Sequence, residues 1–129
     1  MLDHVSITVS DFEAGERFYD AVFAALDIPK VGREPGWAGY GLRADAGHPG
    51  RAYLSIRGAG TPIVADRRHW AFKAPTRAHV DRFHAAGLAV GGVDDGQPGL
   101  RAGYHPHYYG AFLIDPDGNR VEAVCHAAG

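Results

Sequence analysis

The stretch His4-Val5-Ser6-Ile7-Thr8-Val9 alternates between polar and apolar residues, as a β-strand with one buried face does. A second strand-like stretch, His69-Trp70-Ala71-Phe72-Lys73-Ala74, begins 65 residues later and also starts with a histidine. In each half a residue suited to cap a helix, Asp11 or Thr76, follows the histidine by seven positions. Matching spacing in the two halves predicts a duplicated structural module.

The residues after each cap extend this repeat. In the first half, apolar side chains at three- and four-residue steps predict a helix to about Leu26. Three short strands are expected after it, at about 30–33, 37–43 and 52–57, because Gly and Pro clusters separate these stretches.

The second half follows the same order, with a strand from Arg67 to Ala74 and a helix after Thr76. A strand is expected near Val90, followed by an irregular segment at 96–99. The turn Asp115-Pro116-Asp117-Gly118 predicts a hairpin between strands at 108–114 and 119–124, since proline presets φ and glycine accepts a positive φ.

The order strand, helix and three strands, repeated twice, is typical of an α+β fold. We expect two tandem βαβββ modules, at about 1–60 and 66–126, that form an open, cupped and mostly antiparallel sheet with helices on its outer face. The 129 residues suit a single domain.

Composition excludes several classes of function. A net charge of −2 provides no basic surface for nucleic acid, and no apolar run approaches the length of a membrane span. The sequence is expected to begin directly with a strand and to carry no signal sequence. The single cysteine, Cys125, forbids an internal disulfide and fits a reducing cytosol, so a cytoplasmic location is expected.

The eight histidines raise the question of a metal site. Four of them lie in loop-like or helix-like contexts and are expected to be solvated: His48, His79, His84 and His126.

Strand parity places His4 opposite the apolar face of its strand, and His69 and Glu122 can point to the same concave surface. Two neutral imidazoles and one carboxylate form a site used for divalent iron that also suits zinc, manganese, cobalt or nickel. A single histidine at a strand start is more often structural or solvated, so the prediction depends on the three residues together.

The sequence resembles the vicinal oxygen chelate superfamily, which includes glyoxalase I, extradiol dioxygenases and bleomycin-resistance proteins. The matching pieces cover essentially the whole chain: Leu2-Asp3-His4-Val5, Phe18-Tyr19, His69, and the segment Tyr108-Tyr109-Gly110-Ala111-Phe112 leading through Asp115-Pro116-Asp117-Gly118-Asn119-Arg120-Val121 to Glu122. The resemblance implies paired βαβββ modules cupped around a divalent metal, with His4, His69 and Glu122 as ligands, and a homodimer.

One departure from the family pattern concerns a fourth ligand. Glyoxalase I-like members carry a glutamate on the last strand of the first module, whereas the concave face of this strand is expected to present Tyr53, Ser55 and Arg57. Ser55 is the closest equivalent and is a poor metal ligand. The three-ligand set is more similar to the iron site of extradiol dioxygenases.

Extradiol dioxygenases also use an acid–base histidine and a tyrosine. Candidates for catalytic roles beside Glu122 are Tyr108, His105 and His107, with Tyr104 and Tyr109 in the same run. The alternative is a loop whose rings pack on the rim of the cup.

Two hypotheses about function follow. The first is a small metal-dependent enzyme, an isomerase, lyase or extradiol-type dioxygenase, acting on a small molecule chelated through adjacent oxygens. The second is a metal-free protein that binds a drug or another small molecule, as bleomycin-resistance proteins do. Lys73 and Arg57 would suit an anionic substrate if they face the cup, and Trp37 and Tyr40 are either an aromatic wall or part of the core.

Overall fold

The computed structural model describes residues 1–63 and 68–129, which form two four-stranded sheets and two helices. In chain order the elements are β1 (His4–Val9), α1 (Phe12–Ala25), β2 (Lys30–Glu34), β3 (Trp37–Gly41), β4 (Tyr53–Gly58), β5 (His69–Lys73), α2 (Arg77–Ala89), β6 (Val93–Leu100), β7 (Tyr109–Ile114) and β8 (Arg120–Cys125). The predicted α+β class with two βαβββ modules is confirmed. We call the two units module 1 and module 2; their predicted boundary at residue 66, and Arg67, lie outside the described residues.

Each module forms its own sheet, in the orders β1-β4-β3-β2 and β5-β8-β7-β6. The first strand of each module pairs in parallel with the last, and the other pairs are antiparallel, so the sheets are mostly antiparallel, as predicted. β1 and β5 are therefore edge strands of the two described sheets. In module 1 the register sets His4 beside Tyr53 and Ser6 beside Ser55.

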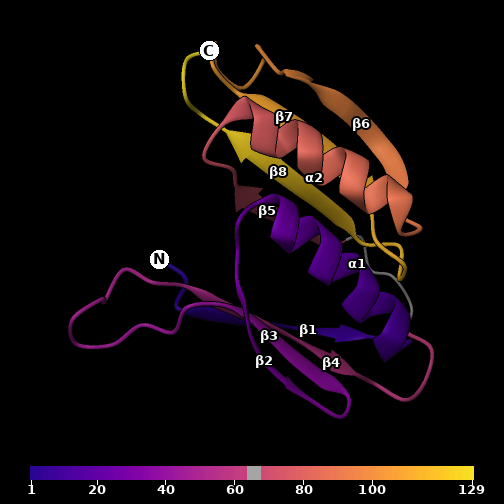
Figure 1. The fold of residues 1–129 in the computed structure, drawn as a ribbon. Helices are drawn as coiled ribbons and strands as arrows, with labels where there is room; N and C mark the ends of the chain where they lie inside the picture. Colours follow the sequence, from indigo (N-terminus) through magenta and orange to yellow (C-terminus); the bar gives the residue numbers. More distant parts are fainter. Residues whose placement is uncertain (64–67) are drawn as a thin grey trace.

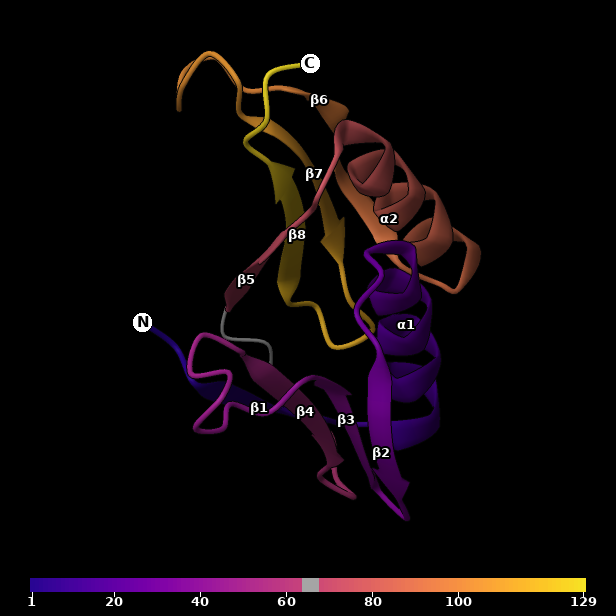
Figure 2. The same ribbon diagram turned by 60° about the vertical axis from the view of Figure 1, so that its left-hand side comes forward.

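The two helices bring the modules together. Figure 1 and Figure 2 show α1 and α2 lying next to one another, with the sheets diverging from them as two separate layers. Ile7, Val9 and Ile56 pack with the helices in one core, as strand parity predicts. Tyr40 was expected either in an aromatic wall of the cup or in the core. It belongs to the core and is 1% exposed.

The predicted helix caps are confirmed. The side chain of Asp11 accepts a hydrogen bond from the amide of Ala14 at 3.2 Å, and Thr76 accepts one from the amide of His79 at 3.4 Å. Each cap offers a side-chain acceptor to an amide of the first helical turn, and the amide of His79 also donates to the carbonyl of Thr76 at 3.1 Å. The equal spacing of strand, cap and helix therefore has the same structural cause in both modules.

The β7–β8 hairpin is also confirmed, because the amide of Gly118 donates to the carbonyl of Asp115 at 3.0 Å and Gly118 has a φ of 85°. The strand expected near Val90 begins at Val93, and the segment 96–99 has the expected irregular pairing but belongs to that strand. Val90 caps α2, and the strand runs from Val93 to Leu100 through the segment expected to be irregular. Shifts of register near Gly96 interrupt the alternation that would have revealed this strand.

His84 was expected to be solvated, and this is wrong. It is 5% exposed on α2, and its Nε2 lies 2.7 Å from Oδ1 of Asp94 on β6.

Neither α1 nor α2, the helices of the described residues, is long and apolar enough to cross a membrane.

Candidate active site

A buried carboxylate lies on the concave face of module 2. Val121 and Ala123 of β8 point into the core, so that Glu122 between them faces the other way, yet it is only 2% exposed. Nε2 of His69, on the neighbouring strand β5, lies 2.8 Å from Oε2 of Glu122. The hydroxyl of Tyr108 donates a short hydrogen bond to Oε1. Both carboxylate oxygens are thus engaged by side chains that reach them from different segments.

Tyr108 keeps its proton in this environment. Burial and, next, the hydrogen bond to the Glu122 carboxylate raise the pKa of the Tyr108 hydroxyl above its usual value of 10.0. A phenol with a raised pKa donates a hydrogen bond at neutral pH and does not act as a base there. Tyr108 therefore orients Glu122 and offers a proton at its Oη.

Three further rings surround Tyr108. The ring centroids of Tyr104 and His105 lie 4.8 and 5.5 Å from that of Tyr108, and the ring of His126 lies 5.4 Å away. Nε2 of His105 is 2.8 Å from Nδ1 of His126. These rings form a rim beside the buried carboxylate.

The backbone fixes the tautomer of His105. The amide of His107 donates to Nδ1 of His105 at 3.1 Å, so that this nitrogen is an acceptor. In the neutral ring the proton then resides on Nε2, which donates to Nδ1 of His126. In this hydrogen bond His105 is therefore the donor and His126 is the acceptor.

Two residues of the aromatic run lie elsewhere. The side chain of His107 is exposed, and His107 contributes to this region through its backbone amide. The hydroxyl of Tyr109 donates to Asp81 of α2 at 2.8 Å, on the side of the sheet covered by that helix. Of the three catalytic candidates in the run, the structure brings Tyr108 and His105 to the site and leaves the side chain of His107 outside it.

Module 1 carries the remaining predicted ligand. Nδ1 of His4 lies 2.7 Å from Oδ2 of Asp3, and 63% of the His4 side chain is exposed. A carboxylate at one ring nitrogen is the usual way in which a metal-binding imidazole is oriented, and it leaves Nε2 for the ion. Further along this face Ser6 and Ser55 form a hydrogen bond of 3.0 Å, and Ser55 is the residue expected at the position of a fourth ligand.

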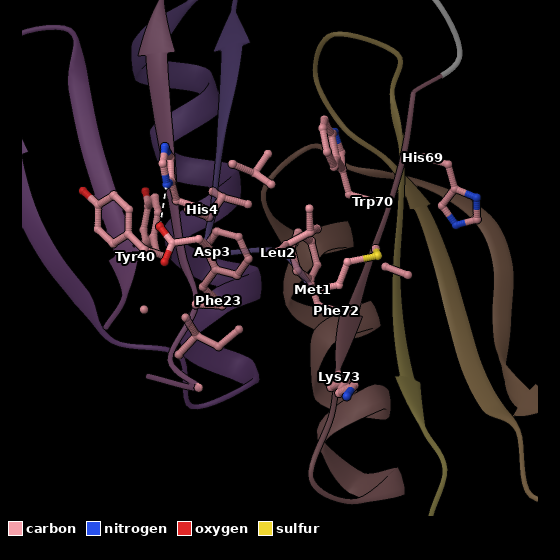
Figure 3. A pocket seen from close by; sticks show the side chains of 18 residues that line it. Met1, Leu2, Asp3, His4, Phe23, Tyr40, His69, Trp70, Phe72 and Lys73 are labelled. Atoms are coloured by element: carbon pink, nitrogen blue, oxygen red, sulfur yellow. Dashed lines mark hydrogen bonds and ion pairs between the residues drawn. The ribbon is translucent and has the colours of Figure 1, made fainter. Parts of the chain in front are cut away.

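The three predicted ligands do not meet within one chain. Among residues 1–63 and 68–129 no three histidine, cysteine or acidic residues lie close enough together to hold a metal ion. His4 and His69 both line a cleft of about 840 Å³ between β1 and β5. Figure 3 shows their imidazoles on opposite sides of this cleft, with neither ring pointing toward the other.

The pair His69 and Glu122 has a spacing that fits a shared ion. Two donor atoms held about 2.1 Å from one metal at a right angle lie about 3 Å apart. Nε2 and Oε2 are 2.8 Å apart, and imidazole nitrogen with carboxylate oxygen suits zinc, iron, manganese, cobalt or nickel. The pair fits as two ligands of a divalent ion, and one more donor is needed.

Sequence reasoning missed the role of Asp3 and the contact between His126 and His105. The signal for Asp3 is its position next to a predicted ligand, because a neighbouring carboxylate can orient an imidazole. The signal for His126 is parity: it lies four residues beyond Glu122, directly after the end of β8, where alternation predicts the same face. His126 is exposed, as expected, yet its ring stacks on His105.

Comparison with known proteins found relatives among solved structures. A glyoxalase/bleomycin resistance protein from Albidiferax ferrireducens T118 is 30% identical, with a TM-score of 0.78 over 98% of this chain and 99% of that chain. A glyoxalase/bleomycin resistance protein/dioxygenase family enzyme from Burkholderia phytofirmans PsJN is 20% identical, with a TM-score of 0.66 over 97% and 98% of the two chains. The fosfomycin resistance protein FosX from Mesorhizobium loti is also 20% identical, with a TM-score of 0.66 over 98% and 92%. No family model and no curated protein sequence matched.

Proposed function

This chain belongs to the glyoxalase/bleomycin resistance protein family, and we propose that it is a small divalent-metal enzyme whose substrate binds through two adjacent oxygen atoms. The observation that carries the proposal is the Glu122 carboxylate, 2% exposed and engaged by His69 and Tyr108 on a concave face. A carboxylate removed from water is costly unless it is paired or binds a metal. Its one histidine partner is itself 43% exposed on its side chain and is thus accessible to an ion.

The third ligand would come from a second copy of the chain. His4 projects from β1, an edge strand, and His69 from β5, the edge strand of the other sheet. Met1 and Leu2 beside His4 are 119% and 63% exposed, so this region carries apolar surface that a partner would cover. In a two-fold dimer, His4 of each protomer would complete the His69–Glu122 pair of the other, giving two equivalent sites.

The ion, when bound, would polarise the substrate oxygens and stabilise negative charge that develops on them. The residues of the chain have separate tasks. His4, His69 and Glu122 would hold the ion, and Asp3 would keep Nδ1 of His4 occupied. Tyr108 keeps its proton and fixes the orientation of Glu122, while the His105–His126 pair lies beside it as a route for a proton between imidazole nitrogens.

The reaction class depends on which ion is present. Iron would favour ring-opening oxygenation, and zinc, nickel, cobalt or manganese would favour isomerase or lyase chemistry on oxygenated small molecules. Ser55 in the fourth ligand position argues against a glyoxalase I with four protein ligands.

A metal-free small-molecule binding protein is the second candidate. The observation that favours it is the separation of His4 from the His69–Glu122 pair within one chain, across a cleft of about 840 Å³ lined largely by apolar side chains. The two candidates differ in metal content, which can be measured directly.

The test is elemental analysis of protein that has never met a chelator. We expect near-stoichiometric divalent metal in the wild type and loss of that metal in His4→Ala, His69→Ala and Glu122→Ala. His48→Ala is the matched control, because His48 is an exposed histidine paired with Asp45 in a loop. Wild-type protein without metal would refute the enzyme proposal and favour the binding protein.

Coexpression of two inactive variants tests the shared site. His4→Ala and Glu122→Ala dimers should each lack metal. Random pairing makes about half of the dimers mixed, and each mixed dimer regains one intact site of two, so that metal content returns to about a quarter of wild type. A site formed within one chain would give no recovery, because neither chain then holds all three ligands.

A further inference from the structure

The concave face of module 1 has an aromatic floor. Alternation along β3 places Ala38 and Tyr40 in the core, so that Trp37 and Gly39 lie on the concave side. The Trp37 ring covers glycines: a Cβ at Gly32 or at Gly39 would lie 2.8 Å from its atoms. The Tyr53 ring also lies against Gly39, and its centroid is 6.5 Å from that of Trp37 with the planes tilted by 30°. The absence of side chains at these glycines lets both rings lie along the sheet.

Two arginines border this floor. The guanidinium of Arg43 lies over the Tyr53 ring, 4.0 Å from its centroid, and Arg57 is the register partner of Trp37 on β4. Trp37, Arg43 and Arg57 line one pocket of about 380 Å³, together with Glu34 and Pro35. The pocket therefore combines the partly exposed Trp37 ring with two cations, while Tyr53 is buried beneath Arg43.

The charges of these arginines are not neutralised by ion pairs. Within the described parts of the chain, neither Arg43 nor Arg57 has a carboxylate oxygen within 4.0 Å, whereas Arg33 on β2 pairs with Glu16 at 2.7 Å. Glu34 is the one acidic residue of the pocket lining, and in the register it lies on the far side of Trp37 from Arg57. Two guanidinium groups against one carboxylate leave a net positive charge in the pocket.

We propose that this pocket binds a planar aromatic anion, such as an aromatic carboxylate, with its ring against Trp37 and its anionic group between Arg43 and Arg57. Guanidinium groups bind carboxylates through paired hydrogen bonds, and flat ring faces favour flat apolar ligands. Arg43 of the pocket lies over Tyr53, which is the register partner of His4, the proposed metal ligand. If the aromatic anion is the substrate, the inference rests on the proposed enzyme function. The binding of the anion in the pocket does not depend on the metal.

Tryptophan fluorescence tests the proposal on the full-length protein. The chain has two tryptophans, and Trp70→Phe leaves Trp37 as the only reporter. Titration with benzoate should quench this fluorescence to saturation, and benzamide, which is similar in shape but neutral, should bind at least about tenfold more weakly. Equal binding of benzoate and benzamide, or no quenching by either, would overturn the proposal.

Arginine variants made in the Trp70→Phe protein test whether Arg43 and Arg57 bind the anionic group. Arg43→Gln and Arg57→Gln should each weaken benzoate binding by about tenfold or more, because each removes a charged hydrogen-bond donor. Arg82→Gln, which changes an exposed arginine on α2, is the control and should bind as the parent does. Parent-like binding by both Arg43→Gln and Arg57→Gln would refute the assignment.

The same titration with and without metal separates this inference from the proposed enzyme. Benzoate preference that persists after chelation supports the pocket whatever the elemental analysis finds. Stoichiometric metal without any benzoate preference would refute the pocket alone and leave the metal site standing.

Discussion

The hydroxyl of Tyr19 on α1 donates a 2.6 Å hydrogen bond to Oδ2 of Asp115 in the β7–β8 turn, and this bond joins module 1 to module 2. Tyr19 is fully buried and Asp115 is 4% exposed. The same carboxylate also accepts from the amides of Asp117 and Asn119 at 2.9 and 2.8 Å. Burial and the negative charge of Asp115 raise the pKa of Tyr19 well above its usual value, so this hydroxyl remains a donor.

Tyr19→Phe should destabilise the protein by about 1–3 kcal/mol, because a charged acceptor loses its donor where water cannot replace it. Urea unfolding followed by circular dichroism measures the change. Tyr104→Phe is the control, since Tyr104 is 66% exposed and should change stability by less than about 0.5 kcal/mol. Equal stability of Tyr19→Phe and wild type would show that this hydrogen bond between the modules contributes nothing to the free energy of unfolding.

Gly87→Ala should lower stability although alanine favours helix. A Cβ at this position of α2 would lie 3.2 Å from Val22 of α1 and would overlap the side chain of Leu113 on β7. Overpacking of this kind costs about 1–3 kcal/mol, which exceeds the gain of about 1 kcal/mol in helix propensity. Thermal unfolding measures the net effect. Leu88→Ala, at an exposed neighbouring position, is the comparison, and a stabilised Gly87→Ala would contradict the close packing.

Asp94→Asn should reduce stability at neutral pH and not in acid. The hydrogen bond from His84, and next that from the amide of Gly96, lower the pKa of Asp94 from its usual 3.8. A carboxyl with a lowered pKa in the folded state stabilises it above pH 3.8, and this contribution disappears as pH falls through the lower, folded-state value. Urea midpoints of wild type and variant should differ at pH 7 and converge below that value. A difference independent of pH would argue against ionisation as the cause.

Tyr108→Phe should weaken metal binding without removing a ligand. The phenol orients the Glu122 carboxylate, and loss of such a partner lowers metal affinity by about 10–100-fold. Competition with a chromophoric chelator measures the affinity. Tyr109→Phe is the matched control, because this adjacent hydroxyl bonds to Asp81 near α2 and its loss should leave the affinity unchanged. Equal metal affinities of the two variants would show that Tyr108 does not contribute to metal binding.

The features that the sequence predicted well depend on near neighbours in the chain. The caps at Asp11 and Thr76 and the turn ending at Gly118 need only a few consecutive residues, and strand parity alone separates Ile7 from His4. The fold class follows, because each module buries the same alternating faces under its helix.

The features that were missed depend on contacts between distant segments. The register shifts near Gly96 hide β6, and His84 is buried because β6 brings Asp94 to it. Parity gives His4 and Glu122 equivalent faces, but the packing of α1 against α2 decides which faces meet, and within one chain these two do not. The assignment of His4, His69 and Glu122 as ligands stays a prediction.

Ser55 also affects the electrostatic balance of the proposed centre. Two neutral imidazoles and one carboxylate would leave a bound divalent ion with one unit of positive charge, whereas a second carboxylate at this position would cancel it. Ser55 is 5% exposed and bonded to Ser6, so the strand keeps a neutral, uncharged pair there. In the proposed centre the serine would therefore favour ligands that carry negative charge, for a reason independent of the arginines that border the aromatic floor.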